Sequence, residues 1–137
     1  MEENKILYSN EAISIATFLG GPLAAGYLFK KNYEAFSQEE KGRKAFFIGL
    51  ISTVLIFVGV FFIPDDIKDK IPGALIPAFY TLMIHFIFEK TQGGWLKEHK
   101  ESGGKFHSGW KAIKIGVVSL VILLSSIMGI VFVADVF

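Results

Sequence analysis

The feature that most constrains this chain is the separation of its charged residues from four long apolar runs. The first run, Ala12–Phe29, has eighteen residues without a charge and ends at Lys30 and Lys31. At about 1.5 Å per residue, an α-helix of this length reaches about 27 Å, close to the hydrocarbon thickness of a bilayer. Three further charge-free runs of eighteen to twenty residues follow, namely Ala45–Pro64, Ile71–Phe88 and Ile115–Ala134. We therefore expect four membrane-spanning helices.

The composition of the whole chain favours the same interpretation. Of the 137 residues 52% are hydrophobic, the mean hydropathy is +0.48, and all 27 charged side chains (14 basic and 13 acidic) lie outside the four runs. A soluble helical domain would need polar faces on helices this long, and the runs have none. The connectors are too short for a folded extramembrane module. We expect one all-α integral membrane domain over residues 1–137, a four-transmembrane-helix bundle.

The residue inventory also excludes several kinds of site. The chain has no cysteine, so disulfides and thiolate metal or redox centres are excluded. The histidines lack a strong zinc-ligand spacing such as HExxH, and the glycine pairs Gly93/Gly94 and Gly103/Gly104 form no phosphate-binding motif. The net charge is only +1. We expect no cofactor, no metal and no nucleic-acid partner.

The basic residues are divided unevenly between the two sides of the expected bundle. Five lie between the first two runs and six between the last two, which makes eleven of the 14, whereas Lys5, Lys68 and Lys70 lie on the other side. Because basic loops stay in the cytoplasm, we expect both longer connectors to be cytoplasmic and both termini external. The connector lysines, with Trp95 and Trp110 at headgroup level, favour contact with an anionic lipid leaflet.

Small side chains along the first run predict a helix-packing face. They recur every four residues in two adjacent rows, Ala12, Ala16, Gly20 and Ala24, with Gly21 and Ala25 beside them. In lipid, small residues at this period let another helix backbone approach closely. Pro22 lacks an amide proton and clashes with the preceding turn, so Gly20, Gly21 and Pro22 are expected to bend the helix near its middle. A packing kink is the simpler interpretation, and a substrate-lining bend of a transporter stays open.

The second and fourth runs resemble each other. Lys44–Ile56 (KAFFIGLISTVLI) and Lys111–Leu123 (KAIKIGVVSLVIL) agree at six of thirteen positions. The match predicts a parallel tandem repeat of two helical hairpins, N-out and C-out, unless shared apolar composition produces it by chance. In either case we expect a close contact between these two helices through small residues, Gly49 and Ser52 on one, Gly116 and Ser119 on the other.

Three histidines are the polar candidates. His85 is the only ionisable group within a run, and it lies three residues from the expected cytoplasmic end. A structural or interfacial role is therefore favoured over a proton relay or a ligand. His99 and His107 belong to the second basic connector, where solvated side chains are the simple interpretation and a metal or headgroup-level site is the alternative.

Three stretches carry a resemblance to a known group of proteins. They are Thr17–Phe29 (TFLGGPLAAGYLF), the Ile63–Pro64 end of the second run, and Gly103–Trp110 (GGKFHSGW). In these the chain resembles a group of small, uncharacterised bacterial four-span membrane proteins. The resemblance implies a multi-pass protein of the bacterial cytoplasmic (inner) membrane, and it implies no activity.

Three functions remain open from the sequence. The leading hypothesis is a non-catalytic membrane subunit or scaffold, partnered by lipids and by a second copy or another membrane protein, because nothing resembles a nucleophile, base and orienter. The alternative is an oligomeric channel or small transporter lined by hydroxyls, from Thr17, Ser52, Thr53, Thr81, Ser119, Ser125 and Ser126. The third is a lipid-acting membrane enzyme using His99 and His107.

Overall fold

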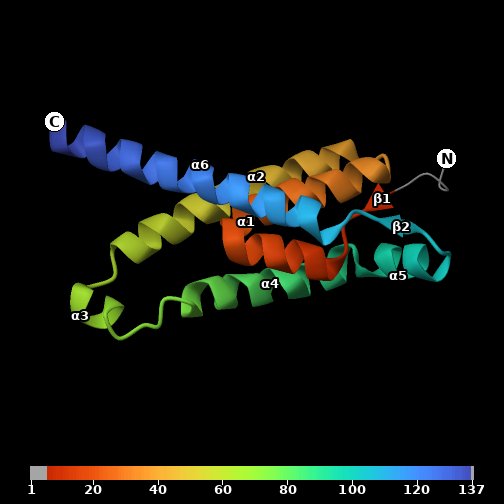
Figure 1. Ribbon diagram of the computed structural model, residues 1–137, viewed down its shortest axis with the longest axis horizontal. Coiled ribbons are helices and arrows are strands. Elements are labelled where there is room, and N and C mark those ends of the chain that lie inside the picture. Colours follow the sequence, from red (N-terminus) through yellow and green to blue (C-terminus); the bar gives the residue numbers. More distant parts are fainter. Residues whose placement is uncertain (1–5, 137) are drawn as a thin grey trace.

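The computed structural model describes residues 6–136, and it is helical apart from one pair of very short strands (Figure 1). In chain order the elements are β1 (Ile6–Leu7), α1 (Asn10–Ala35), α2 (Glu39–Phe61), α3 (Asp65–Lys68), α4 (Leu75–Thr91), α5 (Gly93–Glu101), β2 (Lys105–Phe106) and α6 (Gly109–Val136). Among the described residues, α1, α2 and α6 are long and apolar enough to cross a membrane, by length and composition. These are the properties of a membrane protein.

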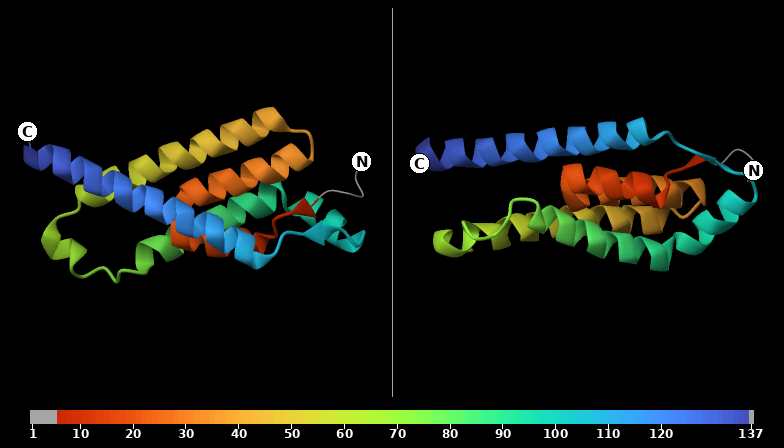
Figure 2. Two further views of the ribbon diagram at one scale, coloured as in Figure 1. Left: turned by 45° about the horizontal axis from the view of Figure 1, so that its top comes forward. Right: turned by 60° about the horizontal axis from the view of Figure 1, so that its bottom comes forward.

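Helix α1 is not straight, because its backbone reverses at Gly21 (Figures 1 and 2). Gly21 has φ 75° and ψ −173°, a conformation open in practice only to glycine. Pro22 then begins a second helical segment, at a position where its missing amide proton costs little. The two segments, residues 10–20 and 22–35, run antiparallel, and we call them the first and second limbs of the α1 hairpin.

Hydrogen bonds between the ends of the hairpin agree with this reversal. The amide of Tyr8 donates to Oδ1 of Asn32 at 2.8 Å, and Nδ2 of Asn32 donates to the carbonyl of Tyr8 at 3.0 Å. Twenty-four residues of straight helix would separate these two positions by about 36 Å. The two ends of α1 therefore lie at the same end of the molecule.

The expectation that the first apolar run crosses the bilayer in one pass is therefore wrong for the folded chain. The limbs have 11 and 14 residues and reach about 17 and 21 Å, less than the hydrocarbon core of about 30 Å. The structure does not support the N-out, C-out arrangement either, because β1 and the last turn of α6 lie at opposite ends of the molecule (Figure 1). The expected repeat of two helical hairpins fails as well, because α1 is itself a hairpin.

The α1 hairpin forms the centre of the structure, and α2, α4 and α6 each pack on it. Most of the buried apolar side chains belong to α1 or to the residues just before it: Leu7, Tyr8, Ala12, Ile13, Ala16, Ala24, Ala25, Leu28, Phe29 and Tyr33. Beyond the hairpin tip α6 extends away from α2 and α4 (Figure 2), and its side chains there are exposed, as at Met128 (72%). The core thus occupies only the half of the molecule that contains the hairpin.

The half that contains the hairpin ends in the basic connectors. β1 pairs in parallel with β2, with Ile6 opposite Lys105 and Leu7 opposite Phe106. The start of α2, the end of α4, helix α5 and the start of α6 all gather at this end (Figure 1), and these segments carry most of the basic residues. The opposite end holds α3 and the end of α6. We call the end that holds β1, β2 and α5 the basic end.

A pair of spin labels tests the reversal directly. Because the chain has no cysteine, Glu11→Cys with Lys31→Cys gives clean labelling at two exposed positions. A straight helix would separate the two backbones by about 30 Å, whereas the hairpin places them at the same end of the molecule. We expect double electron–electron resonance in lipid nanodiscs to give a distance well below about 30 Å. A distribution centred near or above that length would contradict the hairpin.

Candidate functional site

The first limb of the α1 hairpin meets α6 at glycines. A Cβ added at Gly20 would lie 2.6 Å from the carbonyl oxygen of Gly116 and 2.8 Å from Cβ of Ser119. A Cβ at Gly116 would lie 3.0 Å from the carbonyl oxygen of Ala16. Real Cβ atoms essentially never come closer than 3.0 Å to such atoms, and a contact at 3.0 Å is already tighter than most, so the two backbones touch because these positions have no side chain.

The second limb meets α2 in the same way. A Cβ added at Gly49 would lie 2.5 Å from the carbonyl oxygen of Pro22, and one at Gly26 would lie 2.9 Å from that of Ala45. The expected contact between the second and fourth runs is therefore wrong, because the small residues of α2 and of α6 each face the α1 hairpin. The hairpin, with its two limbs, occupies the space in which those helices were expected to meet.

The remaining packing candidates also lie in or beside the hairpin contacts. Those that are buried are Ala16, Gly20, Gly21, Pro22, Ala24, Gly49, Gly116 and Ser119. Ser52 is half-buried on α2. Its neighbour Thr53 is buried instead and donates a 2.8 Å hydrogen bond to the carbonyl of Gly49. The structure thus brings the small residues together around α1, and not around a contact between α2 and α6.

A buried amide cluster closes the open end of the hairpin. Asn32 and Gln92 are 1% and 0% exposed, and Nδ2 of Asn32 donates to Oε1 of Gln92 at 3.1 Å. Gln92 donates in turn to the carbonyl of Phe29 at 3.2 Å, and Asn10 donates to the Glu89 carboxylate. The bonds of Asn32 and Gln92 satisfy amides that would otherwise cost free energy to bury, whereas Oδ1 of Asn10 has no hydrogen-bond partner among the described residues. The hydrogen bonds of the cluster hold both limbs to the end of α4.

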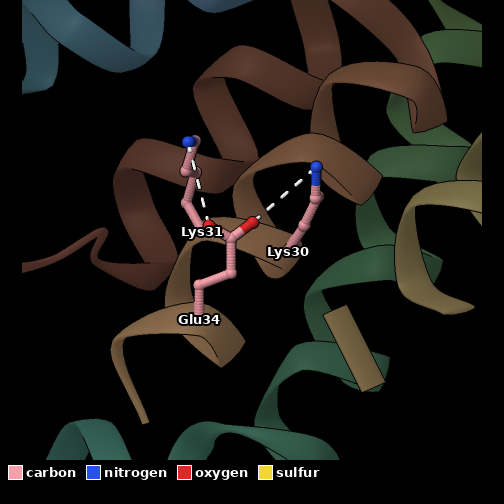
Figure 3. Close-up of polar contacts among 3 residues, drawn as sticks. All are labelled: Lys30, Lys31 and Glu34. Atoms are coloured by element: carbon pink, nitrogen blue, oxygen red, sulfur yellow. Dashed lines mark ion pairs between the residues drawn. The ribbon is translucent and has the colours of Figure 1, made fainter. Parts of the chain in front are cut away.

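Sequence reasoning missed this cluster, because Asn32 and Gln92 stand among charged residues of the connectors and carry no motif of their own. The one available signal was that they are uncharged among lysines and glutamates and that each follows closely after Phe29 or Phe88. Those two phenylalanines do meet, with ring centroids 5.4 Å apart. The charged neighbours Lys30 and Lys31 pair loosely with Glu34, at 3.7 and 4.0 Å (Figure 3). Half-exposed pairs of this kind contribute little to stability.

The two connector histidines hold the strands in place. Nε2 of His99 lies 2.7 Å from the carbonyl oxygen of Lys105, and its ring packs against Gly104. The ring of His107 stacks on Tyr8, with centroids 4.2 Å apart, and its amide donates to the carbonyl of Leu7 at 2.8 Å. Within residues 6–136 no group of three or more His, Asp or Glu side chains is arranged to hold a metal ion.

His85 occupies a different environment from the other two histidines. It is half-buried on α4, and its ring meets that of Phe86 edge-on, with centroids 6.0 Å apart. The ring contact of His85 is with another residue of α4, whereas His99 and His107 contact residues in or beside the two strands. The three histidines thus do not form one site.

Two apolar spaces adjoin the hairpin. The tip cavity, about 240 Å³, lies where α2, α4 and α6 surround Gly20, Gly21 and Pro22. The α2–α4 groove, about 540 Å³, runs along the second limb between those two helices, with Ala25 and Gly26 in its floor. Hydrocarbon side chains dominate both linings, so these spaces suit apolar groups better than ions or polar substrates.

Comparison of the chain with protein-family models, with curated proteins and with solved structures found no match.

Replacing the hairpin glycine tests the importance of the reversal. Gly21→Ala places a Cβ on a backbone conformation that only glycine adopts readily, and it is expected to cost about 1–3 kcal/mol of stability. The matched control is Gly59→Ala on α2, where an added Cβ meets nothing within 4 Å and helix propensity gains up to about 1 kcal/mol. Thermal unfolding in detergent should give a lower midpoint for Gly21→Ala alone. Equal midpoints for the two variants would contradict the strain argument.

Acidification should loosen the contact between β1 and β2. Burial, and secondly the ammonium of Lys111, lowers the pKa of His107 below its ordinary value of 6.5. The unfolded chain thus binds this proton more readily, so the stabilisation is complete above about pH 6.5 and is lost as the pH falls through the lowered pKa. We expect hydrogen exchange at the His107 amide, corrected for its intrinsic rate, to accelerate with acid. His107→Phe should make protection independent of pH, and unchanged protection of the native chain down to about pH 5 would contradict the assignment.

Proposed function

We propose that this chain is a non-catalytic, multi-pass protein of the bacterial cytoplasmic membrane, with three crossings and one re-entrant hairpin. Helices α2 and α6 have 23 and 28 residues, and α4 has 17 residues, or about 26 Å, at the short end of the range for a membrane helix. The basic end favours the cytoplasmic side. In this arrangement β1 is cytoplasmic, the α1 hairpin enters from that side, and the end of α6 is external.

The proposed role is that of a subunit or scaffold that associates with a second copy through α6. Within the chain, the closest helix contacts pass through the glycines at positions 20, 26, 49 and 116. On the outer half of α6, a shallow notch formed by Ser126, Gly129 and Ala134 among larger side chains has no helix packed into it within the described chain. A notch of this kind lets another backbone approach closely in lipid. It is the observation on which the proposal rests.

Enlarging the notch residue tests this association. Gly129→Leu adds four carbon atoms in the notch, and Val131→Phe adds four on an exposed part of the same helix outside it. Gly129→Leu should weaken self-association about five- to thirtyfold, the equivalent of ~1–2 kcal/mol, while the control stays near the native value. Photobleaching step counts in liposomes measure the fraction of dimers. A native chain that stays monomeric at every protein-to-lipid ratio, with no co-purifying membrane protein, would contradict the role.

A small transporter or channel is the second candidate, and the α1 hairpin is the observation that favours it. Non-helical backbone at membrane depth occurs where it is buried in protein or lines a cavity, and interrupted helices often form transporter binding sites. The hairpin tip borders the tip cavity. However, the hydroxyls of Thr17, Thr53 and Ser126 donate to carbonyls of their own helices and leave a weakly polar path. Flux of ions or small solutes across liposomes that contain the purified protein would favour this candidate over the subunit or scaffold.

The lipid-acting enzyme has no observation in its favour among the described residues. His99 and His107 are engaged in holding β2, by a hydrogen bond and by stacking on Tyr8. Among the described residues, no hydrogen bond joins either ring to a hydroxyl or a carboxylate, as a nucleophile, base and orienter would require.

A further inference from the structure

The α2–α4 groove combines an apolar body with a charged end. Its lining runs from Lys41 to Ile56 on α2 and from Ile76 to Thr91 on α4, about 22 Å along each helix. The groove exists because α2 and α4 both pack on the α1 hairpin and make few contacts with each other. One leaflet contributes about 15 Å to the hydrocarbon core, so the groove is longer than the acyl-chain region of one leaflet. A chain-like apolar group from one leaflet therefore fits along it.

The charged groups of this groove all lie at the basic end of the molecule. Lys41 and Lys44 are the only charged side chains in the lining, and they lie one turn apart at the start of α2. Lys41 forms no ion pair within residues 6–136, and Lys44 lies 3.9 Å from Glu40 in a pair whose side chains are both more than two-thirds exposed. So exposed a pair holds its lysine weakly. Both ammonium groups can therefore take an outside anion.

The end of the groove also carries side chains suited to headgroup level. Tyr33 and Thr91 line it beside the two lysines. Tyrosine is enriched at the membrane interface because its ring is apolar and its hydroxyl is polar. Further along, the lining consists of side chains such as Ile48, Phe79 and Met83. The change from polar to apolar follows the order of groups in a phospholipid, from headgroup to acyl chain.

We propose that the α2–α4 groove is a binding site for one anionic phospholipid. Its phosphate lies against Lys41 and Lys44, and one acyl chain lies along the second limb of the α1 hairpin. The volume of about 540 Å³ is within the range of ligand pockets in proteins. The groove opens sideways between two membrane helices, so its occupant comes from the bilayer. This site rests on the membrane location of the chain and is independent of association through α6.

Lipid titration of the full chain tests the charged end of the site. The purified protein is delipidated in a neutral detergent and titrated with phosphatidylglycerol or phosphatidylcholine of identical acyl chains, and native mass spectrometry counts the lipids on the monomer. The native chain should bind one phosphatidylglycerol in preference to phosphatidylcholine. The double variant K41Q/K44Q should lower phosphatidylglycerol binding about tenfold and remove the preference. The double variant K97Q/K100Q removes the same charge from α5, outside the groove, and should change little.

A second pair of variants tests the acyl-chain part of the groove. Met83→Trp fills the groove from an exposed position on α4, and Met128→Trp makes the same change at an exposed position on α6. Met83→Trp should reduce the binding of both lipids, whereas Met128→Trp should not. Equal losses in K97Q/K100Q and K41Q/K44Q would show diffuse attraction to the basic end and overturn the site. So would unchanged binding in Met83→Trp. Because lipid is counted on the monomer, failure of the α6 association does not affect the result.

Discussion

The close approach of backbones at glycine holds this fold together, since in lipid the hydrophobic effect does not drive one helix against another. The α1 hairpin has an irregular backbone at its tip, and such a backbone is tolerated at membrane depth only when protein surrounds it. Gly20 brings α6 against the first limb, and Gly49 brings α2 against the second. The helix dipoles of the two limbs also place opposite partial charges at the tip, because the first limb ends there with its negative end and the second limb begins there with its positive end. The tip is therefore close to electrically neutral.

At the open end of the hairpin the amide cluster holds the two limbs to α4, just as the glycines near the tip hold them to α2 and α6. Asn32 and Gln92 have few alternatives once buried, because an unpaired amide in an apolar surrounding is costly. Their bonds tie three distant parts of the chain together: the residues before α1, the end of its second limb and the end of α4. The α2–α4 groove follows from this arrangement, since α4 is held to the hairpin and not to α2.

The sequence predicts the apolar helices well and their arrangement poorly. The run Ala45–Pro64 corresponds to most of α2 and Ile115–Ala134 to most of α6, because lipid contact requires a continuous apolar stretch wherever the helix lies. Hydropathy does not register the reversal inside Ala12–Phe29, since a hairpin and a straight span have the same composition. The Gly20–Gly21–Pro22 triplet indicates an interruption, but the angle depends on ψ at Gly21 and on the contacts around it.

Partners of the small residues were harder to predict than their positions. A glycine such as Gly116 indicates that some backbone comes close, and which one depends on the path of the whole chain. The similarity of the second and fourth runs suggested that they meet each other. Both are instead shaped to meet the hairpin, so the same small-residue pattern serves two contacts with one element. The buried amides were missed because they stand among charged residues of the connectors.

The contact between Gly116 and Ala16 also has a consequence for the order of events during biosynthesis. Ala16 on the first limb leaves the ribosome a hundred residues before its partner Gly116 on α6. At about 5–20 residues per second, this delay is roughly 5–20 s. During that time the side of the limb that later packs on α6 contacts lipid or the insertion machinery. The first limb therefore reaches its final packing only after the start of α6 has been synthesised, beyond the strand β2 that pairs with β1.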